Sequence, residues 1–502
     1  MVKNMKNKKI LLGMIIINLI SMILGFLRDS SIAFSLGATA ISDVFMFITN
    51  LPTVLFSALG WVIMSTFVPT YTEVMVNQSE EKLNKFSNTF IKSIAIISGA
   101  ITIILIVFNK IFIHILAPGF KGEYFILTQK LFFIIIPALI FLSIASCIAA
   151  ILNANKKMIY VSLLGIPINI TTIIGILFVY PKHGLELTTF IVLLGSILQI
   201  LIFINPLRKT GFKFTKDFNL RDENIKKLIS IIGPMLIGVM AQQINVLFGG
   251  AITSTLSKGS LTSYNLATKI VNATYNSIIL IGISYIFPYL SHDFASGKIE
   301  VFKEKVSKSI NIIFLILMPI NILLIQLNDE VISILYGYGS FSRDAIQLTS
   351  NILLFLSIGV VFMGIRELIN RAYYSAKNTK IPMKYSVLGI SINIILGLLL
   401  AKRFGVIGVA IASSLSILLS TFAICFKFKK DFGVKFIKQK DLLKYVFITV
   451  ILFYITKFTH SFISMSVNSI ATIIITSLIT TIGYFILIYI FKVDIKSYLK
   501  SF

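Results

Sequence analysis

Several ionisable side chains interrupt the long apolar stretches of this sequence. Arg28 and Asp29 close the first stretch at its predicted outer end, and Asp43 opens the second. Lys269 lies about nine residues into a later stretch, too deep to reach either membrane surface easily, and Arg366 lies within another. Arginine binds phosphate through a planar fork of donors, and lysine binds it as a point charge. A cavity lined by these cations would favour an anionic substrate.

The elements that must position these residues are membrane-spanning helices. Of the 502 residues, 56% are hydrophobic and 13% are charged, with a mean hydropathy of +0.92, which is far from the balance of a soluble protein. A helix of about 20 residues crosses the hydrocarbon core. Such stretches lie near 9–27, 44–70, 87–108, 127–152, 158–180, 186–205, 228–256, 261–290, 306–326, 346–375, 382–401, 404–426, 444–462 and 468–491. We predict an all-α polytopic membrane protein with about fourteen transmembrane helices.

An internal repeat predicts the domain organisation. LLGIPINI at 163–170 returns as VLGISINI at 387–394, and IHILAPGF at 113–120 is echoed by ISILYGYG at 332–339. Duplicated bundles are how many transporters build a site that opens alternately to each side of a bilayer. We therefore expect two pseudo-symmetric lobes of six helices around a cavity. The predicted parts are an N-lobe at 1–207, a basic cytoplasmic linker at 208–227, a C-lobe at 228–426, and helices 13 and 14 with a tail at 427–502.

The distribution of charge orients the chain in the membrane. With the lysine-rich N-terminus in the cytoplasm, about 32 of the 46 basic residues fall on the cytoplasmic side, as the positive-inside rule requires. Both termini are then cytoplasmic. The formal net charge of +26 has the same origin, because basic loops suit the anionic lipids of the inner leaflet. No loop is long enough to hold a nucleic-acid-binding domain, so we expect membrane lipids and no nucleic acid as partners.

Each ionisable residue also has a structural interpretation. Arg28 and Asp29 can simply pair with one another or reach the outer interface. Lys92 can reach the interface or satisfy backbone carbonyl groups. Arg366 and Glu367 can form an ion pair between helices. These alternatives stay open at the level of sequence.

Helix-breaking residues mark possible sites of bending. Pro52, Gly60 and Pro69 interrupt the second apolar stretch, and Gly233 and Pro234 open the seventh. Such residues are tolerated in membrane helices where the backbone faces a cavity or a moving neighbour. We expect gating or kinking there, with static kinks as the alternative.

Motifs for catalysis are missing from the sequence. There is no glycine-rich phosphate loop ending in Lys-Ser or Lys-Thr, and the four histidines are scattered singly without metal-ligand spacing. No nucleophilic triad or paired-carboxylate site is apparent. We therefore predict a transporter rather than an enzyme, with no metal and no cofactor.

Several longer motifs resemble a known family. ILGFLRDSSIAFSLGATAISDVF at 23–45, NLP at 50–52 and FVPTYTE at 67–73 look like the opening of the MurJ/MviN lipid II flippases, which belong to the multidrug/oligosaccharidyl-lipid/polysaccharide exporter superfamily. GPMLIG at 233–238 resembles the start of the family's seventh helix. NRAYYSAKNTKIPMKYS at 370–386 is similar to its segment between helices 10 and 11.

The resemblance implies a function and a set of site residues. It implies translocation of an undecaprenyl-diphosphate-linked peptidoglycan precursor, lipid II, from the inner to the outer leaflet by alternating access. Cationic residues of a central cavity would hold the diphosphate. Arg28, Asp29 and Asp43 match the family's arginine, aspartate and following aspartate, Lys269 stands where the family usually has arginine, and Arg366 fits its basic position in helix 10. Cell-wall synthesis enzymes are further expected partners.

Some positions depart from the family pattern and keep alternatives open. Met22 stands where many members carry a further arginine, and Leu55 and Phe56 lie where they place charged residues. A reduced cationic set is compatible with export of another lipid-linked oligosaccharide. A small-molecule antiporter of the same superfamily would instead need acidic groups in its cavity. A scaffold that recruits cell-wall enzymes would tolerate loss of all the intramembrane charges.

Overall fold

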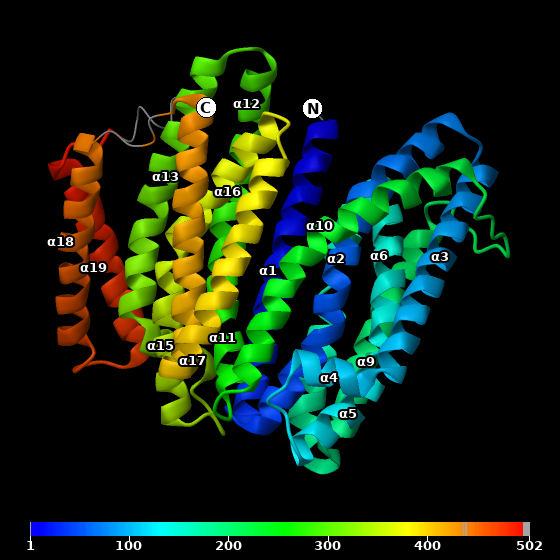
Figure 1. Ribbon diagram of the computed structural model, residues 1–502, viewed down its shortest axis with the longest axis horizontal. Coiled ribbons are helices and arrows are strands. Elements are labelled where there is room, and N and C mark those ends of the chain that lie inside the picture. The colour runs from blue at the N-terminus through cyan, green and yellow to red at the C-terminus, as the bar shows by residue number, and fades with distance from the viewer. Residues whose placement is uncertain (1, 435, 437–438, 495–502) are drawn as a thin grey trace. The chain divides into compact units, whose positions relative to one another are not determined.

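The computed structural model describes residues 2–434, 436 and 439–494, and these residues form helices and no strand (Figure 1). The predicted all-α class is therefore confirmed. The chain divides into two compact units, Met1–Leu261 and Thr262–Phe502.

The first unit contains most of the predicted first seven spans. Its helices are α1 (Val2–Leu36), α2 (Ala40–Asn77), α3 (Glu80–Val107), α4 (Asn109–Leu116), α5 (Glu123–Ile135), α6 (Ala138–Ala154), α7 (Met158–Val161), α8 (Ile166–Ile174), the π-helix η1 (Gly175–Val179), α9 (Tyr180–Arg208) and α10 (Glu223–Ser254). Polar caps set two of the starts. Thr39 and Ser42 form a reciprocal capping box before α2, and the Ser79 hydroxyl accepts from the N–H of Lys82 in α3.

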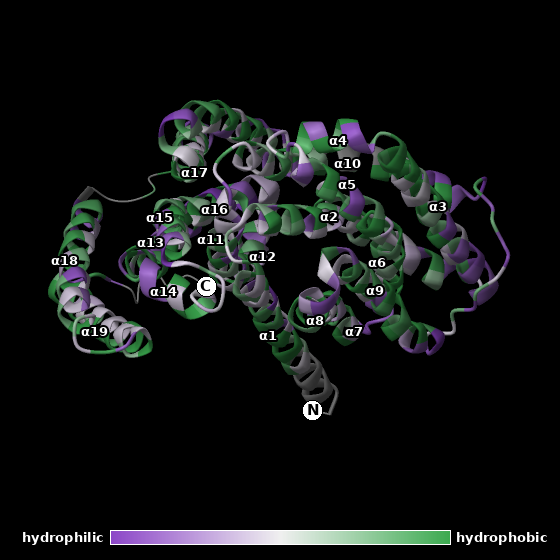
Figure 2. Ribbon diagram, turned by 90° about the horizontal axis from the view of Figure 1, so that it is seen from below, coloured by the Kyte–Doolittle hydropathy of each residue, from purple (hydrophilic) through white to green (hydrophobic). Residues whose placement is uncertain are grey.

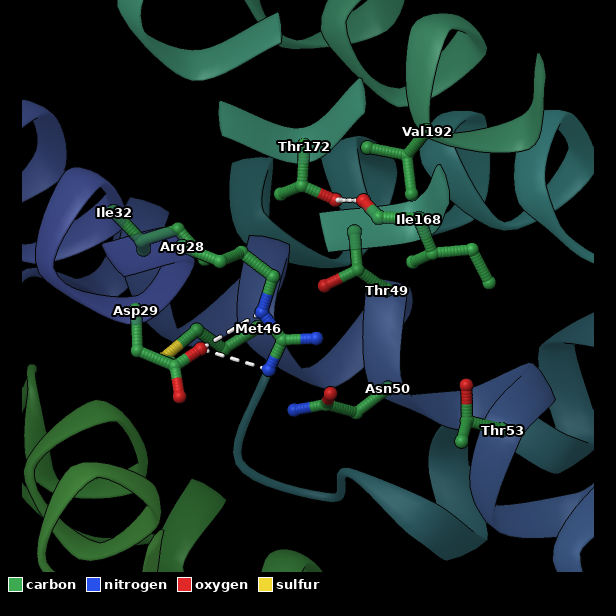
Figure 3. Close-up of a pocket in the computed structure, with 10 residues that line it drawn as sticks. All are labelled: Arg28, Asp29, Ile32, Met46, Thr49, Asn50, Thr53, Ile168, Thr172 and Val192. Atoms are coloured by element: carbon green, nitrogen blue, oxygen red, sulfur yellow. Dashed lines mark hydrogen bonds and ion pairs between the residues drawn. The ribbon is translucent and has the colours of Figure 1, made fainter. Parts of the chain in front are cut away.

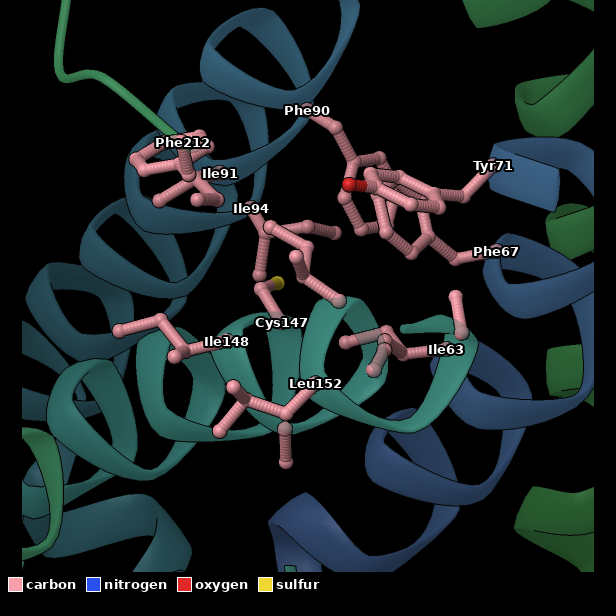
Figure 4. Close-up of a cluster of buried hydrophobic side chains, with 14 of the residues drawn as sticks. Ile63, Phe67, Tyr71, Phe90, Ile91, Ile94, Cys147, Ile148, Leu152 and Phe212 are labelled. Carbon is pink, nitrogen blue, oxygen red and sulfur yellow. The ribbon is translucent and has the colours of Figure 1, made fainter. Parts of the chain in front are cut away.

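The core of the first unit lies where α2, α3 and α6 meet (Figure 4). The ring of Phe67 stacks on that of Phe90 with centroids 4.2 Å apart. On α6, Cys147 and the small residues Ala149 and Ala150 are fully buried. Small side chains let membrane helices approach closely, so α6 can lie against both neighbours.

The second unit begins within α11 (Ser260–Thr274). It continues with the π-helix η2 (Tyr275–Leu280), α12 (Ile281–Ala295), α13 (Ile299–Gln326), α14 (Asn328–Tyr336), α15 (Arg343–Ile358), α16 (Val360–Ser375), α17 (Lys380–Phe432), α18 (Gln439–Ile463) and α19 (Ser469–Ile490). The last two helices lie side by side (Figure 1). Two buried tyrosines, one on each helix, form hydrogen bonds with α13. Tyr445 donates to Asn311 Oδ1 at 2.9 Å, and Tyr484 donates to the Leu315 carbonyl at 2.5 Å.

Two long helical stretches fold back on themselves at glycines. Gly184 within α9 has φ +73° and ψ −173°, and Gly405 within α17 has φ +58° and ψ −141°. Beyond Gly184, α9 packs against η1 and α8, and the Thr188 hydroxyl lies 3.4 Å from the Gly175 carbonyl. Beyond Gly405, the chain passes so close to Leu400 that a Cβ on Gly408 would lie 2.2 Å from its carbonyl oxygen. Each stretch is therefore a helical hairpin.

The two units repeat the same local elements. α3 and α13 are both 28 residues long, and each is followed by a short helix, α4 or α14. Lys156 and Lys377 both adopt positive φ, at 60° and 57°, just before the hairpins. The two units thus share these local features, although 163–165 form a turn before α8 and the matching segment 387–394 lies wholly within α17. The predicted lobe boundaries remain a prediction, and by its contacts α10 belongs to the compact unit that ends at Leu261.

Among the described residues, eleven helical segments are long and apolar enough to cross a membrane. Two of them, Met158–Arg208 and Lys380–Phe432, are the hairpins and have the length for two crossings each. Hydrophobic residues cover most of the helices (Figure 2). The chain is a multi-pass membrane protein, and about fourteen crossings remains the predicted number. One boundary was wrong: α1 continues to Leu36, so Arg28 lies inside the helix rather than at its end.

Candidate functional site

A hollow in the first unit surrounds the ion pair of Arg28 and Asp29 (Figure 3). It lies among α1, α2, α8 and α9 and is partly open to solvent. The lining side chains are Arg28, Asp29, Ile32, Met46, Thr49, Asn50, Thr53, Ile168, Thr172 and Val192. The structure thus brings together two of the predicted site residues with a set of neutral polar groups.

Arg28 forms an ion pair with Asp29 through one edge of its guanidinium group. Its Nε and Nη2 lie 2.9 and 2.7 Å from the same oxygen, Asp29 Oδ1. The side chain of Asp29 is 3% exposed and that of Arg28 is 21% exposed. The remaining guanidinium nitrogen is directed away from Asp29 into the hollow (Figure 3). The pairing predicted as the structural alternative therefore exists, and it leaves one guanidinium nitrogen turned toward the hollow.

The neutral polar residues that line the hollow were not predicted from the sequence. Thr49, Asn50 and Thr53 come from α2, and Thr172 comes from α8. The hydroxyls of Thr49 and Thr172 donate to carbonyls of their own helices, at 2.8 and 2.7 Å, which leaves the hydroxyl oxygens as acceptors. The spacing of Thr49 and Thr53, four residues apart, was the available signal, because it places both on one helix face.

Asp43 has a different environment from Arg28 and is not among the residues that line the hollow. It is 4% exposed, and its Oδ2 accepts a hydrogen bond from the backbone N–H of Gly259 at 2.7 Å. Gly259 has φ +82°, and a Cβ there would lie 2.2 Å from the Ala38 carbonyl oxygen. The carboxylate therefore bonds the segment after α10 to the first turn of α2. A substrate-binding role for Asp43 remains a prediction.

The predicted cations of the second unit lie on α11 and α16. Lys269 is half-buried within α11. Arg366 on α16 contacts both arms of the α17 hairpin, with Nη2 3.1 Å from Ser386 Oγ and Nη1 3.5 Å from Ser420 Oγ. The neighbouring Glu367 accepts from Arg371 Nε at 2.9 Å, one turn along the same helix. Arg366 is thus bonded to two serine hydroxyls, and its substrate-binding role stays a prediction.

Lys92 has the structural role that was its alternative interpretation. Its ammonium donates to the carbonyl oxygens of Thr215 and Asp217, at 2.7 and 3.0 Å. These carbonyls belong to the segment between α9 and α10. Lys92 is therefore a structural residue.

The predicted breaks in the second apolar stretch do not divide it. α2 runs from Ala40 to Asn77 with Pro52 and Pro69 inside it. Gly60 makes room for an aromatic ring, because a Cβ there would lie 2.8 Å from the ring of Phe56. The predicted break at Gly233 and Pro234 falls in α10, and the surroundings of both residues lie outside the described part of the chain. The gating role of Pro52, Gly60, Gly233 and Pro234 stays a prediction.

Among the described residues, no group of three histidine, cysteine, aspartate or glutamate side chains is placed to hold a metal ion. The hollow instead offers a guanidinium, an amide and hydroxyl oxygens. Such donors and acceptors can bind phosphate oxygens and sugar hydroxyls without a metal.

Comparison of the sequence with known families identifies the family to which the chain belongs. The sequence pattern described as "Lipid II flippase MurJ" matches residues 32–489. The chain belongs to the lipid II flippase MurJ family. A probable lipid II flippase MurJ of Buchnera aphidicola subsp. Baizongia pistaciae is 25% identical over 468 residues, which cover 92% of this chain and 91% of that protein. The lipid II flippase MurJ of Thermosipho africanus is 27% identical over 442 residues, with 88% and 89% coverage.

Solved structures agree with membership of the MurJ family. A lipid II flippase MurJ in an inward closed conformation superposes with a TM-score of 0.80 at 27% identity, covering 96% of this chain and 99% of that one. An inward-facing multidrug resistance MATE transporter of the MOP superfamily gives a TM-score of 0.71 at 14% identity, covering 82% and 94%. The second likeness shows a common fold alone.

Proposed function

We propose that this chain is a transporter that moves lipid II, the undecaprenyl-diphosphate-linked peptidoglycan precursor, from the inner to the outer leaflet by alternating access. The observation that carries the proposal is the hollow around Arg28 in a chain of the MurJ family. A diphosphate must exchange its hydration for protein donors as it crosses a membrane. A guanidinium with one side held by Asp29 and the other turned into the hollow offers such donors in a fixed orientation.

The polar neighbours of Arg28 suit the rest of the headgroup. The amide of Asn50 can both donate and accept, and the oxygens of Thr49 and Thr172 can accept from sugar hydroxyls. We assign Arg28 and Asp29 of the first unit, and Lys269 and Arg366 of the second, to substrate binding. Asp43 contributes by holding the backbone near Gly259 in place.

Export of another lipid-linked oligosaccharide is the second candidate. Met22, which replaces a family arginine, and the apolar Leu55 and Phe56 favour it, because they leave fewer cations for the diphosphate. The hollow carries one cation and one anion, so it lacks the acidic excess that a cation antiporter would need.

Depletion of the protein tests the proposed function and separates these candidates. Cells that lose it are expected to accumulate lipid II in the inner leaflet. Lipid extraction and mass spectrometry would identify the intermediate. Accumulation of a different lipid-linked glycan would favour the second candidate, and unchanged levels of all such lipids would contradict both.

Lys269 provides a test in the second unit. Replacement by alanine is expected to slow lipid II translocation about ten- to a hundredfold, because a charged hydrogen bond contributes about 1.5–3 kcal/mol. Lys269→Arg, which restores the residue usual in the family, is the matched control and should retain transport. The measurement is outer-leaflet lipid II per amount of membrane-inserted protein. Undiminished translocation by a stably inserted Lys269→Ala protein would exclude this role.

We further propose that both termini are cytoplasmic and that cell-wall synthesis enzymes are partners. The excess of basic residues in the loops assigned to that side supports the orientation. Cysteine labelling at the two termini from each side of the membrane would test it.

A further inference from the structure

Residues 212–221 of the connector between α9 and α10 are hydrogen-bonded along one side of α3. The N–H of Lys213 donates to Asn84 Oδ1 at 3.0 Å, and the carbonyl of Lys213 accepts from Asn88 Nδ2 at 2.8 Å. The same Asn88 accepts from the N–H of Thr215 through Oδ1 at 3.1 Å. Side-chain amides of a helix thus satisfy the connector backbone much as a neighbouring strand would.

The same pattern continues along the connector. Lys92 donates to the carbonyls of Thr215 and Asp217, and Thr89 Oγ1 accepts from the N–H of Asn219 at 3.2 Å. Its first residue, Phe212, is buried in the core of the unit (Figure 4). The basic linker predicted from the sequence is therefore held in a defined position.

The residues bonded to α3 alternate along the connector, and the side chains between them are exposed. Backbone groups of Lys213, Thr215, Asp217 and Asn219 make the bonds to α3. Phe214 is 62% exposed and Phe218 is 45% exposed, and Lys216 between them is exposed too. The connector thus presents two aromatic rings and a lysine at the surface of the unit.

The connector lies along α3 near residue 87, where the predicted membrane span begins. α3 has 28 residues, whereas about 20 residues cross the hydrocarbon core, so part of the helix extends beyond it. The first turns carry Glu80, Glu81, Lys82 and Lys85, which identifies this end as the part outside. The connector is bonded to the residues that follow, from Asn84 onward.

We propose that the connector is a docking surface for the headgroups of anionic membrane phospholipids. Phe214 and Phe218 would enter the interface, as aromatic side chains do at headgroup level. Lys213, Lys216 and Arg221 would meet lipid phosphates, and Asp217 is the one acidic residue among 213–221. The pairing of exposed rings with cations on a rigidly held segment fits an anionic membrane surface better than water. The inference does not depend on which lipid the protein transports.

Tryptophan fluorescence in vesicles tests the docking. The chain has a single tryptophan, so Phe214→Trp in a Trp61→Phe background gives one reporter. Lys82→Trp in the same background is the control, at an exposed position in the first turn of α3 that lies outside the connector. Both full-length proteins would be reconstituted with brominated lipids in phosphatidylcholine, with or without phosphatidylglycerol. We expect quenching of the Phe214→Trp protein to exceed that of the control by roughly threefold. Equal quenching of the two, or ready quenching of the Phe214→Trp protein by aqueous acrylamide, would overturn the proposal.

A charge reversal tests the preference for anionic headgroups. Lys216→Glu added to the Phe214→Trp protein should reduce bromolipid quenching in vesicles with phosphatidylglycerol to the value in phosphatidylcholine alone. Lys216 is exposed, so the fold should tolerate the change. Quenching that is the same in both lipids and unaffected by Lys216→Glu would overturn the anionic part of the proposal.

Discussion

Replacement of Arg28 by alanine is expected to abolish most transport and to destabilise the first unit. The variant removes the donors that face the hollow, and a charged hydrogen bond to phosphate contributes about 1.5–3 kcal/mol. It also takes from Asp29, with its side chain 3% exposed, the cation that pairs with it. Breaking a buried ion pair from one side costs about 3–5 kcal/mol. Transport should fall at least about tenfold, and the melting temperature of the purified protein should drop.

A neutral pair separates the two effects of Arg28. In Arg28→Gln combined with Asp29→Asn, the two amides can still bond to one another, and no buried charge is left. We expect this protein to regain stability and to remain inactive in lipid II translocation. Transport restored together with stability would mean that the pair is structural only. That result would contradict a substrate-binding role for Arg28.

Gly259→Ala is expected to destabilise the first unit strongly. The positive φ of +82° disfavours any Cβ by about 1–3 kcal/mol, and the added atom would meet the Ala38 carbonyl oxygen at 2.2 Å. The backbone would have to shift, which would pull the Gly259 N–H from Asp43 Oδ2. The melting temperature in detergent and the yield of monodisperse protein would measure the loss.

Gly122→Ala is the matched control for this site. Gly122 also has positive φ, +57°, but no atom lies within 4 Å of its ideal Cβ. Its substitution should therefore show the backbone cost without the clash. Asp43→Ala should weaken the same attachment as Gly259→Ala, and Asp43→Asn should weaken it less, because an amide oxygen can still accept. Equal melting temperatures for the two glycine variants would show that the contact with Ala38 relaxes freely.

The membrane helices could be predicted well because hydrophobicity over about 20 residues is a strong and local signal. The predicted stretch at 306–326 lies inside α13, and the stretch at 468–491 corresponds to α19. The end of α1 was predicted too early, because two charged residues in a row, Arg28 and Asp29, are typical of the end of a membrane span. Their mutual ion pair lowers the cost of keeping both inside the helix.

The candidate site was predicted only in part. Arginine and lysine in apolar stretches are conspicuous, so Arg28, Lys269 and Arg366 could be named from the sequence. Thr49, Asn50 and Thr172 could not, because threonine and asparagine are common in membrane helices and their role depends on which helix they face. The partners of Arg366 were also missed, since Ser386 and Ser420 lie on the two arms of a hairpin that closes at Gly405.

The amino-acid sequence alone determined that the chain lies in a lipid bilayer, and it showed the approximate limits of the apolar segments, the internal repeat and the cations within those segments. These properties follow from local composition, which sets the cost of burial in lipid residue by residue. Only the tertiary structure decided which of the charged residues share a hollow, that Asp43 fastens the backbone at Gly259, and that the basic connector is bonded along α3. Those facts depend on contacts between residues far apart in the chain. A hydrogen bond forms only when the fold brings its donor and acceptor within about 3 Å, so local sequence does not reveal it.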